Sequence, residues 1–326
     1  MSAKKIVVLG TGGTIAGVAA LETDNLGYQA GQLGVAQLLA AVPGLCDANA
    51  VSWVTEQVAQ RDSKDMDFSV WRTLALRCAA WLADPSVHAL VITHGTDTLE
   101  ETAWWLDRVL GARKPVVLTC AMRPATALAP DGPQNLRDAL AVALAPGVCG
   151  VLVVAAGVVH GARRVQKVHP YRLDAFGSGD AGPLGWVEEG RVRWASDRPP
   201  EQDRSAGDAL EKIANATEEP WVEIVMSHAG ARGALVDALV REGVQGLVVA
   251  ATGNGSVHQA LEAALVRAQA AGVRVLCATR CPEGAIVSGG AALFADAQGL
   301  SPVKARIALV LELVSSQGTR GPDGAA

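Results

Sequence analysis

The sequence predicts an α/β protein with two α/β domains, each built on a mainly parallel sheet, the N-terminal domain being the larger. Short apolar runs recur with helical segments between them, which is typical of parallel strands joined by crossover helices. Half of the residues are hydrophobic but only 4% are aromatic, and this aliphatic filling suits layered α/β packing. The chain of 326 residues is also long for a single hydrophobic core, so two domains are expected.

The apolar runs locate the expected strands at residues 5–9, 87–93, 115–119, 148–155, 221–226, 246–251 and 273–278. Between residues 187 and 218 the sequence becomes polar and contains proline pairs. We therefore expect an N-terminal catalytic α/β domain over residues 1–195, a linker over 196–218, and a C-terminal α/β domain over 219–326.

Net charge, apolar segment lengths and the placement of cysteines and histidines argue against nucleic-acid, membrane and metal partners. The net charge is −5, and no basic surface that could follow a phosphate backbone is evident, so nucleic acid is not an expected partner. Neither a secretory signal nor an apolar stretch of membrane-spanning length is found, so we expect a cytoplasmic protein without membrane contact. The cysteines lie mostly in apolar segments and the histidines are scattered, which argues against a metal site.

The first expected strand ends in a glycine-rich turn, Gly10-Thr11-Gly12-Gly13-Thr14-Ile15. Thr14 therefore stands at the carboxyl end of a strand, where open α/β sheets bind ligands. The turn lacks the third glycine of the dinucleotide fingerprint, and no Gly-Lys-Ser/Thr follows as a phosphate loop requires. A hydroxyl beside uncovered backbone amides suits a nucleophile with an oxyanion hole; a plain strand-to-helix turn is the structural alternative.

A second turn, His94-Gly95-Thr96-Asp97-Thr98, follows the expected strand 87–93 in the same way. If the two strands are neighbours, both turns meet in one crevice. Thr98 with Glu101 predicts a capping box at the start of the next helix. Gly111 is placed to end that helix in the left-handed conformation.

These two motifs, Thr-Gly-Gly-Thr-Ile-Ala-Gly and His-Gly-Thr-Asp-Thr-Leu-Glu-Glu-Thr-Ala, resemble the signatures of bacterial-type L-asparaginases and glutaminase-asparaginases. The likeness continues at residues 31–35, 121–124, 131–135, 182–185, 253–255 and 302–306. It implies an amidohydrolase that converts L-asparagine to L-aspartate and ammonia without metal or organic cofactor. It also implies a left-handed crossover in the larger domain and a homotetramer of intimate dimers.

The resemblance assigns roles to the matching positions. Thr14 matches the nucleophile, and Tyr28 matches the tyrosine that hydrogen-bonds it. Ser63 matches the serine that holds the substrate α-carboxylate, and Asp97 matches the carboxylate that binds the α-ammonium group. Gly95 belongs to the same substrate-binding turn.

The resemblance also assigns roles to a lysine and to a residue from a neighbouring subunit. Thr96 matches the family's second threonine and Lys167 the lysine behind it, although without the resemblance Lys167 reads as part of a solvated basic loop. Asn254 matches an asparagine lent to the site by a neighbouring subunit. Shared active sites are therefore expected.

Amide hydrolysis needs an activated hydroxyl, oxyanion donors and a proton for the leaving ammonia. Attack by Thr14 gives a threonine-bound acyl-enzyme that water then hydrolyses. The Gly13 and Thr96 amides are expected to bind the oxyanion, a contribution of roughly 3–4 kcal/mol per donor. Two routes for the Thr14 proton stay open. Lys167 can act as the base through Thr96 if burial lowers the pKa of its ammonium group, although nearby Asp97 would raise that pKa again. Tyr28 is the alternative relay.

Lys64 is a departure from the pattern of the periplasmic family members, which have Gln after the carboxylate-binding serine as a ligand of the substrate ammonium. Their acidic ligand from the adjacent subunit also has no counterpart within residues 286–290. An ammonium group directed at the substrate ammonium would repel it. Lys64 must therefore pair with Asp62, Asp65 or Glu283, turn into solvent, or face a substrate with a modified amine.

Two other readings keep the scaffold and change the function. The substrate can be glutamine, or an aminoacyl-tRNA as in amidotransferase subunits; the tRNA version needs a basic surface or an extra domain, and neither is evident. A non-enzymatic alternative is a catalytically silent amino-acid sensor on the same scaffold. The presence of Thr14, Tyr28, Thr96, Asp97 and Lys167 together argues against the sensor.

Overall fold

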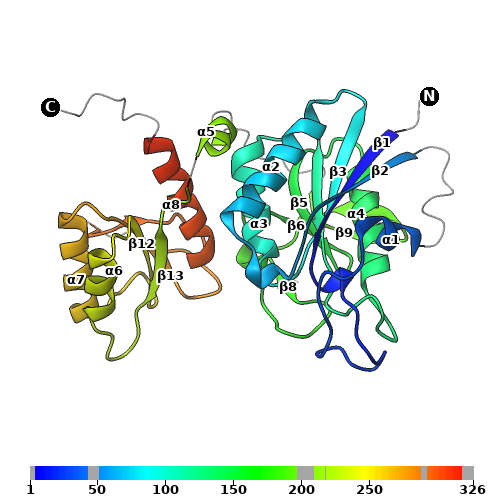
Figure 1. Cartoon of the computed structure of the whole chain (residues 1–326). Helices are drawn as coiled ribbons and strands as arrows, with labels where there is room; N and C mark the ends of the chain where they lie inside the picture. Colours follow the sequence, from blue (N-terminus) through cyan, green and yellow to red (C-terminus); the bar gives the residue numbers. More distant parts are fainter. Residues whose placement is uncertain (1–3, 43–50, 197–208, 217, 288–291, 318–326) are drawn as a thin grey trace. The chain divides into compact units, whose positions relative to one another are not determined.

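A computed structural model describes residues 4–42, 51–196, 209–216, 218–287 and 292–317 (Figure 1). The chain divides into two compact units, Met1–Leu210 and Glu211–Ala326. Most of the expected linker over 196–218 lies outside the described residues, and helix α5 (Ala209–Asn215) occupies part of the remainder. The domain limits expected from the sequence therefore stay a prediction.

The N-terminal unit is built on an eight-stranded sheet with the order β10-β9-β6-β5-β4-β3-β1-β2. Its strands are β1 (Lys4–Gly12), β2 (Val51–Arg61), β3 (Val87–Thr93), β4 (Pro115–Thr119), β5 (Gly150–Ala155), β6 (Val158–Gly161), β9 (Gly185–Glu188) and β10 (Arg191–Trp194). The strands from β2 to β5 pair in parallel, whereas β6, β9 and β10 are antiparallel additions at one edge. The expected mainly parallel α/β sheet is confirmed.

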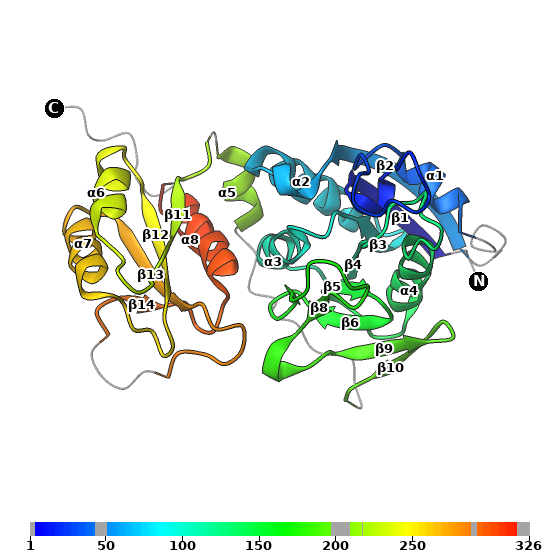
Figure 2. The ribbon, with the colours of Figure 1, turned by 90° about the horizontal axis from the view of Figure 1, so that it is seen from below.

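Helices cover both faces of this sheet. They are α1 (Val35–Ala40), α2 (Phe68–Ala83), α3 (Leu99–Leu110) and α4 (Gly132–Leu144). Successive side chains of a strand point to opposite faces, and Ile6 and Val8 pack in one cluster with residues of α1 and α4. Figure 2 shows α2 and α3 on the other face. Every residue from Ile6 to Leu9 is fully buried, which explains the unbroken apolar run of β1.

Short elements complete the N-terminal unit. They are three 3-10 turns, η1 (Thr14–Ala16), η2 (Ser63–Asp65) and η3 (Gly179–Ala181), and a small antiparallel hairpin of β7 (Gln166–Lys167) and β8 (Phe176–Gly177). Helix α3 ends as predicted, because Gly111 is left-handed with φ 51°. The capping-box prediction is wrong: the Thr98 side chain makes no cap bond, since its hydroxyl donates to the Ser63 carbonyl at 2.7 Å.

The C-terminal unit has a four-stranded parallel sheet in the order β11-β12-β13-β14. Its elements are β11 (Val222–Met226), α6 (Ala234–Arg241), β12 (Gly246–Ala251), α7 (Gln259–Ala270), β13 (Arg274–Thr279), β14 (Ala295–Asp296) and α8 (Pro302–Gln317). Within this unit α6 and α7 cover one face of the sheet and α8 the other (Figure 1). The expected second, smaller α/β domain is confirmed. Over the described part of the chain, no helix combines the length and apolarity needed to cross a membrane.

Candidate active site

The nucleophile turn is shaped by two glycines at the end of β1. Gly12 and Gly13 have φ of 103° and 81°, a region that other residues rarely enter. A Cβ atom on Gly13 would lie 2.2 Å from the Cα of Gly95, so the two turns expected to meet do pack backbone against backbone. Because β1 pairs in parallel with β3, with Gly10 opposite Thr93, both turns leave the sheet at the same edge.

Thr14 opens η1 and is 6% exposed. Its Oγ1 lies 2.6 Å from the hydroxyl of Tyr28, which returns over the turn because Val18 and Gln29 form a bridge that closes the intervening loop. Burial raises the pKa of Tyr28, and its hydrogen bond to Thr14 opposes this shift only in part. The phenol therefore keeps its proton at neutral pH. Gly17 allows the close approach, since a Cβ there would lie 2.8 Å from the Tyr28 ring.

Ser63 connects the second turn to η2. Its side chain is almost fully buried, and its Oγ accepts a hydrogen bond from the Asp97 amide at 3.1 Å. A Cβ on Gly95 would lie 2.5 Å from the Ser63 Oγ, so this glycine is needed for the approach. Gly13, Gly95 and Ser63 therefore form one tightly packed group beside Thr14.

Lys167 reaches the second turn from the β7–β8 hairpin. Its Nζ donates to the Thr96 Oγ1 at 2.8 Å and lies 2.6 Å from the Asp97 Oδ1. The Lys167 side chain is 17% exposed whereas that of Asp97 is 52% exposed. Lys167 is thus held by two partners of the predicted site and does not belong to a solvated basic loop, which the sequence without the resemblance had suggested.

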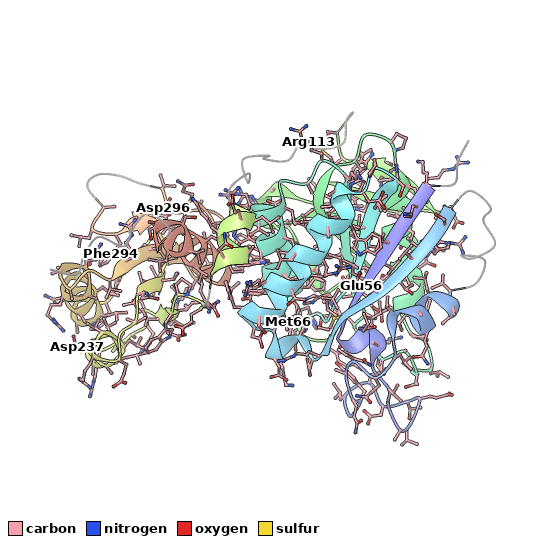
Figure 3. All side chains as sticks on the ribbon, turned by 45° about the horizontal axis from the view of Figure 1, so that its top comes forward. Glu56, Met66, Arg113, Asp237, Phe294 and Asp296 are labelled. Carbon is pink, nitrogen blue, oxygen red and sulfur yellow. The ribbon has the colours of Figure 1, made fainter. Side chains whose placement is uncertain are left out.

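Lys64 lies in η2 beside Ser63 and carries two ion pairs. Its Nζ is 3.0 Å from Asp62 and 2.9 Å from Asp65. Its hydrogen bond to Asp65, and to a smaller extent that to Asp62, raises the pKa of this exposed ammonium group, so Lys64 stays charged. Met66, labelled in Figure 3, follows directly after the turn. Of the alternatives that the sequence left open, pairing with Asp62 and Asp65 is the one observed.

The expected oxyanion donors need one correction. The Gly13 amide donates to the Arg61 carbonyl at 2.8 Å, so it is already used and the assignment of this amide to the oxyanion is wrong. Its bond to Arg61 is part of the pairing that joins β1 to β2. The Thr96 amide, in contrast, has no backbone acceptor within the described ranges.

Asn254 belongs to the C-terminal unit, and its role in a neighbour's site stays a prediction. It stands between Gly253 and Gly255, both with positive φ. Its Nδ2 donates to the Val287 carbonyl at 3.0 Å, and its Oδ1 accepts from the Val287 amide at 2.6 Å. The side chain is therefore held in a fixed orientation at the end of β12.

A buried hydrogen-bonded chain beneath the second turn was not foreseen from the sequence. The Trp71 Nε1 donates to the Thr102 Oγ1 at 2.8 Å, and this oxygen lies 2.9 Å from the His94 Nε2. The His94 Nδ1 lies 2.7 Å from the Gly95 carbonyl oxygen. His94 and Thr102 both lie within the second motif, but nothing in the sequence indicates that they bond to each other or to Trp71, which comes from a separate helix.

Among the residues that the structure describes, no group of three or more His, Cys, Asp or Glu side chains is arranged to hold a metal ion. The polar groups of the Thr14 cluster are hydroxyls, one lysine ammonium and one carboxylate. This set suits hydrogen bonding to a small polar substrate and the attack of a hydroxyl on it.

Comparison with known proteins places this chain in one family. Residues 5–200 match the family profile "Asparaginase, N-terminal", and residues 221–320 match "Glutaminase/Asparaginase C-terminal domain". The chain therefore belongs to the asparaginase family, as the two sequence motifs predicted.

Curated relatives match over most of their length. L-asparaginase 2 of Escherichia coli is 36% identical, over 96% of this chain and 89% of the relative. Glutaminase-asparaginase of Pseudomonas fluorescens biotype A is also 36% identical, over 97% of this chain and 88% of the relative. A crystal structure of a probable cytoplasmic L-asparaginase from Campylobacter jejuni superposes with a TM-score of 0.87, at 35% identity and 95% coverage of both chains.

Proposed function

We propose that this protein is an L-asparaginase, an amidohydrolase that converts L-asparagine to L-aspartate and ammonia through a threonine-bound acyl-enzyme. The observation that carries the proposal is the 2.6 Å contact between the hydroxyls of Thr14 and Tyr28. It places a buried hydroxyl at a strand end against a second group that exchanges protons. Membership of the asparaginase family supports the reaction class, and relatives named L-asparaginase support the substrate.

The proposed reaction has two halves. Thr14 Oγ attacks the side-chain amide carbon, the C–N bond breaks, and the nitrogen leaves as ammonia with the proton that the hydroxyl gave up. Water then attacks the resulting ester, aspartate is released, and the Thr14 hydroxyl regains a proton. The Thr96 amide is proposed as an oxyanion donor, and loss of one such donor typically costs about 10²–10³ in kcat.

Substrate binding is proposed at the second turn and η2. Ser63 and Asp97 are joined by the bond from the Asp97 amide to the Ser63 hydroxyl, so the groups proposed for the α-carboxylate and α-ammonium stand side by side. Asp97 is half-exposed, which leaves one side of its carboxylate open to a ligand. Gly95 keeps the space between them free of side-chain atoms.

Tyr28 is the better-supported relay for the Thr14 proton. It contacts Thr14 directly, whereas Lys167 reaches Thr96 and Asp97. Because its pKa is raised, Tyr28 acts as a neutral hydroxyl that accepts the proton of Thr14 while passing its own to the leaving nitrogen. Lys167 is proposed to hold Thr96 and Asp97 in place.

Glutamine is the second candidate substrate, since relatives named glutaminase-asparaginase match this chain as closely as the L-asparaginases do. The chemistry is the same and the substrate is one methylene longer, a difference worth about 1–3 kcal/mol in a pocket. A homotetramer of intimate dimers, with Asn254 completing a neighbour's site, and a cytoplasmic location stay predictions.

Ammonia release from L-asparagine by purified protein tests the proposal, with Thr14→Ala as the decisive variant. This change removes one hydroxyl at a turn, so turnover should be abolished while circular dichroism stays unchanged. Thr73→Ala is the matched control, because it removes an exposed hydroxyl of helix α2 that donates to the Ser69 carbonyl of the same helix. Near wild-type ammonia release by a folded Thr14→Ala protein would overturn the assignment. Parallel assays with glutamine decide between the two substrates.

A further inference from the structure

His94 lies fully buried beneath the turn that carries Thr96 and Asp97. Its Nδ1 is 2.7 Å from the Gly95 carbonyl oxygen, and because a carbonyl only accepts, Nδ1 must carry the hydrogen. Burial lowers the pKa of His94 to about 4, against a smaller opposing effect of the Gly95 bond. The ring is therefore neutral at neutral pH, and Nε2 is an acceptor.

The hydroxyl of Thr102 occupies that acceptor. Thr102 Oγ1 receives the indole N–H of Trp71 at 2.8 Å, so its own hydrogen is directed to the His94 Nε2 at 2.9 Å. Trp71 is in turn fixed by stacking on Trp105, with ring centroids 5.4 Å apart. Every donor in the chain from Trp71 to the Gly95 carbonyl thus has one defined direction, which fixes both the tautomer and the ring orientation of His94.

The last bond of this chain fixes a peptide plane. The Gly95 C=O and the Thr96 N–H belong to one planar trans peptide and point in opposite directions. Holding the carbonyl against the buried imidazole therefore turns the Thr96 N–H away from the core. Gly13, which precedes Thr14, packs directly on the same peptide segment. A Cβ atom added to Gly13 would lie 2.2 Å from the Gly95 Cα.

We propose that His94 is a positioning residue for amide hydrolysis, and that the chain Trp71–Thr102–His94 aims the Thr96 N–H at the oxyanion formed when Thr14 attacks. The inference rests on the proposed function, since an oxyanion arises only in that reaction. Charge on the carbonyl oxygen develops in the transition state and not in the bound substrate. The chain therefore acts on kcat, with little effect on KM.

His94→Leu and His94→Asn form the first test in the full-length protein. Leucine fills the buried space but donates no hydrogen bond, so kcat should fall about tenfold to a hundredfold, short of the roughly 10²–10³ lost with a whole donor, while KM changes less than twofold. Asparagine places an amide N–H where Nδ1 stands and should restore most of the kcat. A kcat within twofold of wild type in His94→Leu, or no recovery with asparagine, overturns the proposal.

Thr102→Val and Thr102→Ser give a second test that leaves the histidine in place. Valine removes the hydroxyl that donates to the His94 Nε2 and helps to hold the ring in place, so it should lower kcat severalfold, whereas serine should restore it. Val109→Ala is the matched control: it destabilises the same helix from its buried side without touching the chain, so its kcat should equal that of wild type. Equal kcat losses in Thr102→Val and Val109→Ala would show that the chain only supports the fold.

A spectroscopic readout reports the positioning directly. Imidazole ¹⁵N spectra of the wild-type protein at neutral pH should show His94 with a protonated Nδ1 and a bare Nε2, and the opposite tautomer overturns the proposal. Failure of the proposed function is recognised separately. In that case Thr14→Ala retains turnover, whereas an inactive Thr14→Ala together with unaffected His94 and Thr102 variants refutes only the positioning role.

Discussion

Acidification should weaken the N-terminal unit through His94. The folded-state pKa is about 4 against an ordinary value of 6.5, because burial disfavours the charged ring. A depressed folded pKa means that the contribution is fully present above pH 6.5 and is lost as the pH falls toward 4, since the unfolded chain takes up a proton that the folded one refuses. At about 1.4 kcal/mol per pH unit, the full loss over that interval is about 3 kcal/mol.

The pH dependence of unfolding checks this value. Urea unfolding of the wild-type protein and of His94→Asn at pH 7 and pH 4.5 is compared, because asparagine does not titrate and all other groups are common to both proteins. The stability of the wild-type protein should fall by about 2–3 kcal/mol more than that of the variant across this interval. Parallel losses in the two proteins, equal to within about 1 kcal/mol, would refute the reasoning that His94 is buried and neutral.

Three further predictions concern the site itself. Tyr28→Phe removes the 2.6 Å contact with Thr14; kcat for asparagine should fall by about 10²–10⁴, as for loss of a proton-transfer group, and a loss below threefold would exclude Tyr28 as the relay. Lys64→Gln should lower KM for asparagine with little change in kcat, since it removes a cation and leaves Asp62 and Asp65 without their shared ion-pair partner; an unchanged or higher KM would show that Lys64 is harmless or helpful. Mixing the inactive variants Thr14→Ala and Asn254→Ala under conditions of subunit exchange should restore part of the activity if sites are shared. No recovery despite demonstrated exchange would speak against a shared site.

Much of the parallel core could be predicted because its strands are buried on both faces and therefore read as unbroken apolar runs. β1, β3, β4 and β12 are of this kind. Edge strand β2 was missed because its residues are a mixture of half-buried and exposed positions. Polar residues such as Glu56, labelled in Figure 3, hide the apolar pattern; the Glu56 carboxylate accepts hydrogen bonds from Arg77 and Trp81. β6, β9 and β10 are four residues long, too short for periodicity to show.

The candidate site likewise has local features that the sequence reveals and long-range features that it does not. Residues that lie within a motif, such as Thr14, Gly95, Thr96 and Asp97, could be named because a strand end and a glycine turn are local signals. The direction of each hydrogen bond could not. Thr98 was expected to cap its own helix but bonds to Ser63, thirty-five positions away, and only tertiary packing brings that carbonyl within reach.

The Asp97–Lys167 pair would couple the proposed ammonium-binding site to the hydroxyl cluster. The Lys167 Nζ lies 2.6 Å from the Asp97 Oδ1 and 2.8 Å from the Thr96 Oγ1, so its contact with Asp97 is the shorter one. A substrate α-ammonium bound at the open side of Asp97 would compete with Lys167 for the same carboxylate. Lys167 would then depend more strongly on the Thr96 hydroxyl, which belongs to the residue whose amide is proposed to face the oxyanion. Occupation of the proposed ammonium site would thereby strengthen the Lys167–Thr96 contact, and a substrate that lacks the α-amine should lose kcat as well as affinity.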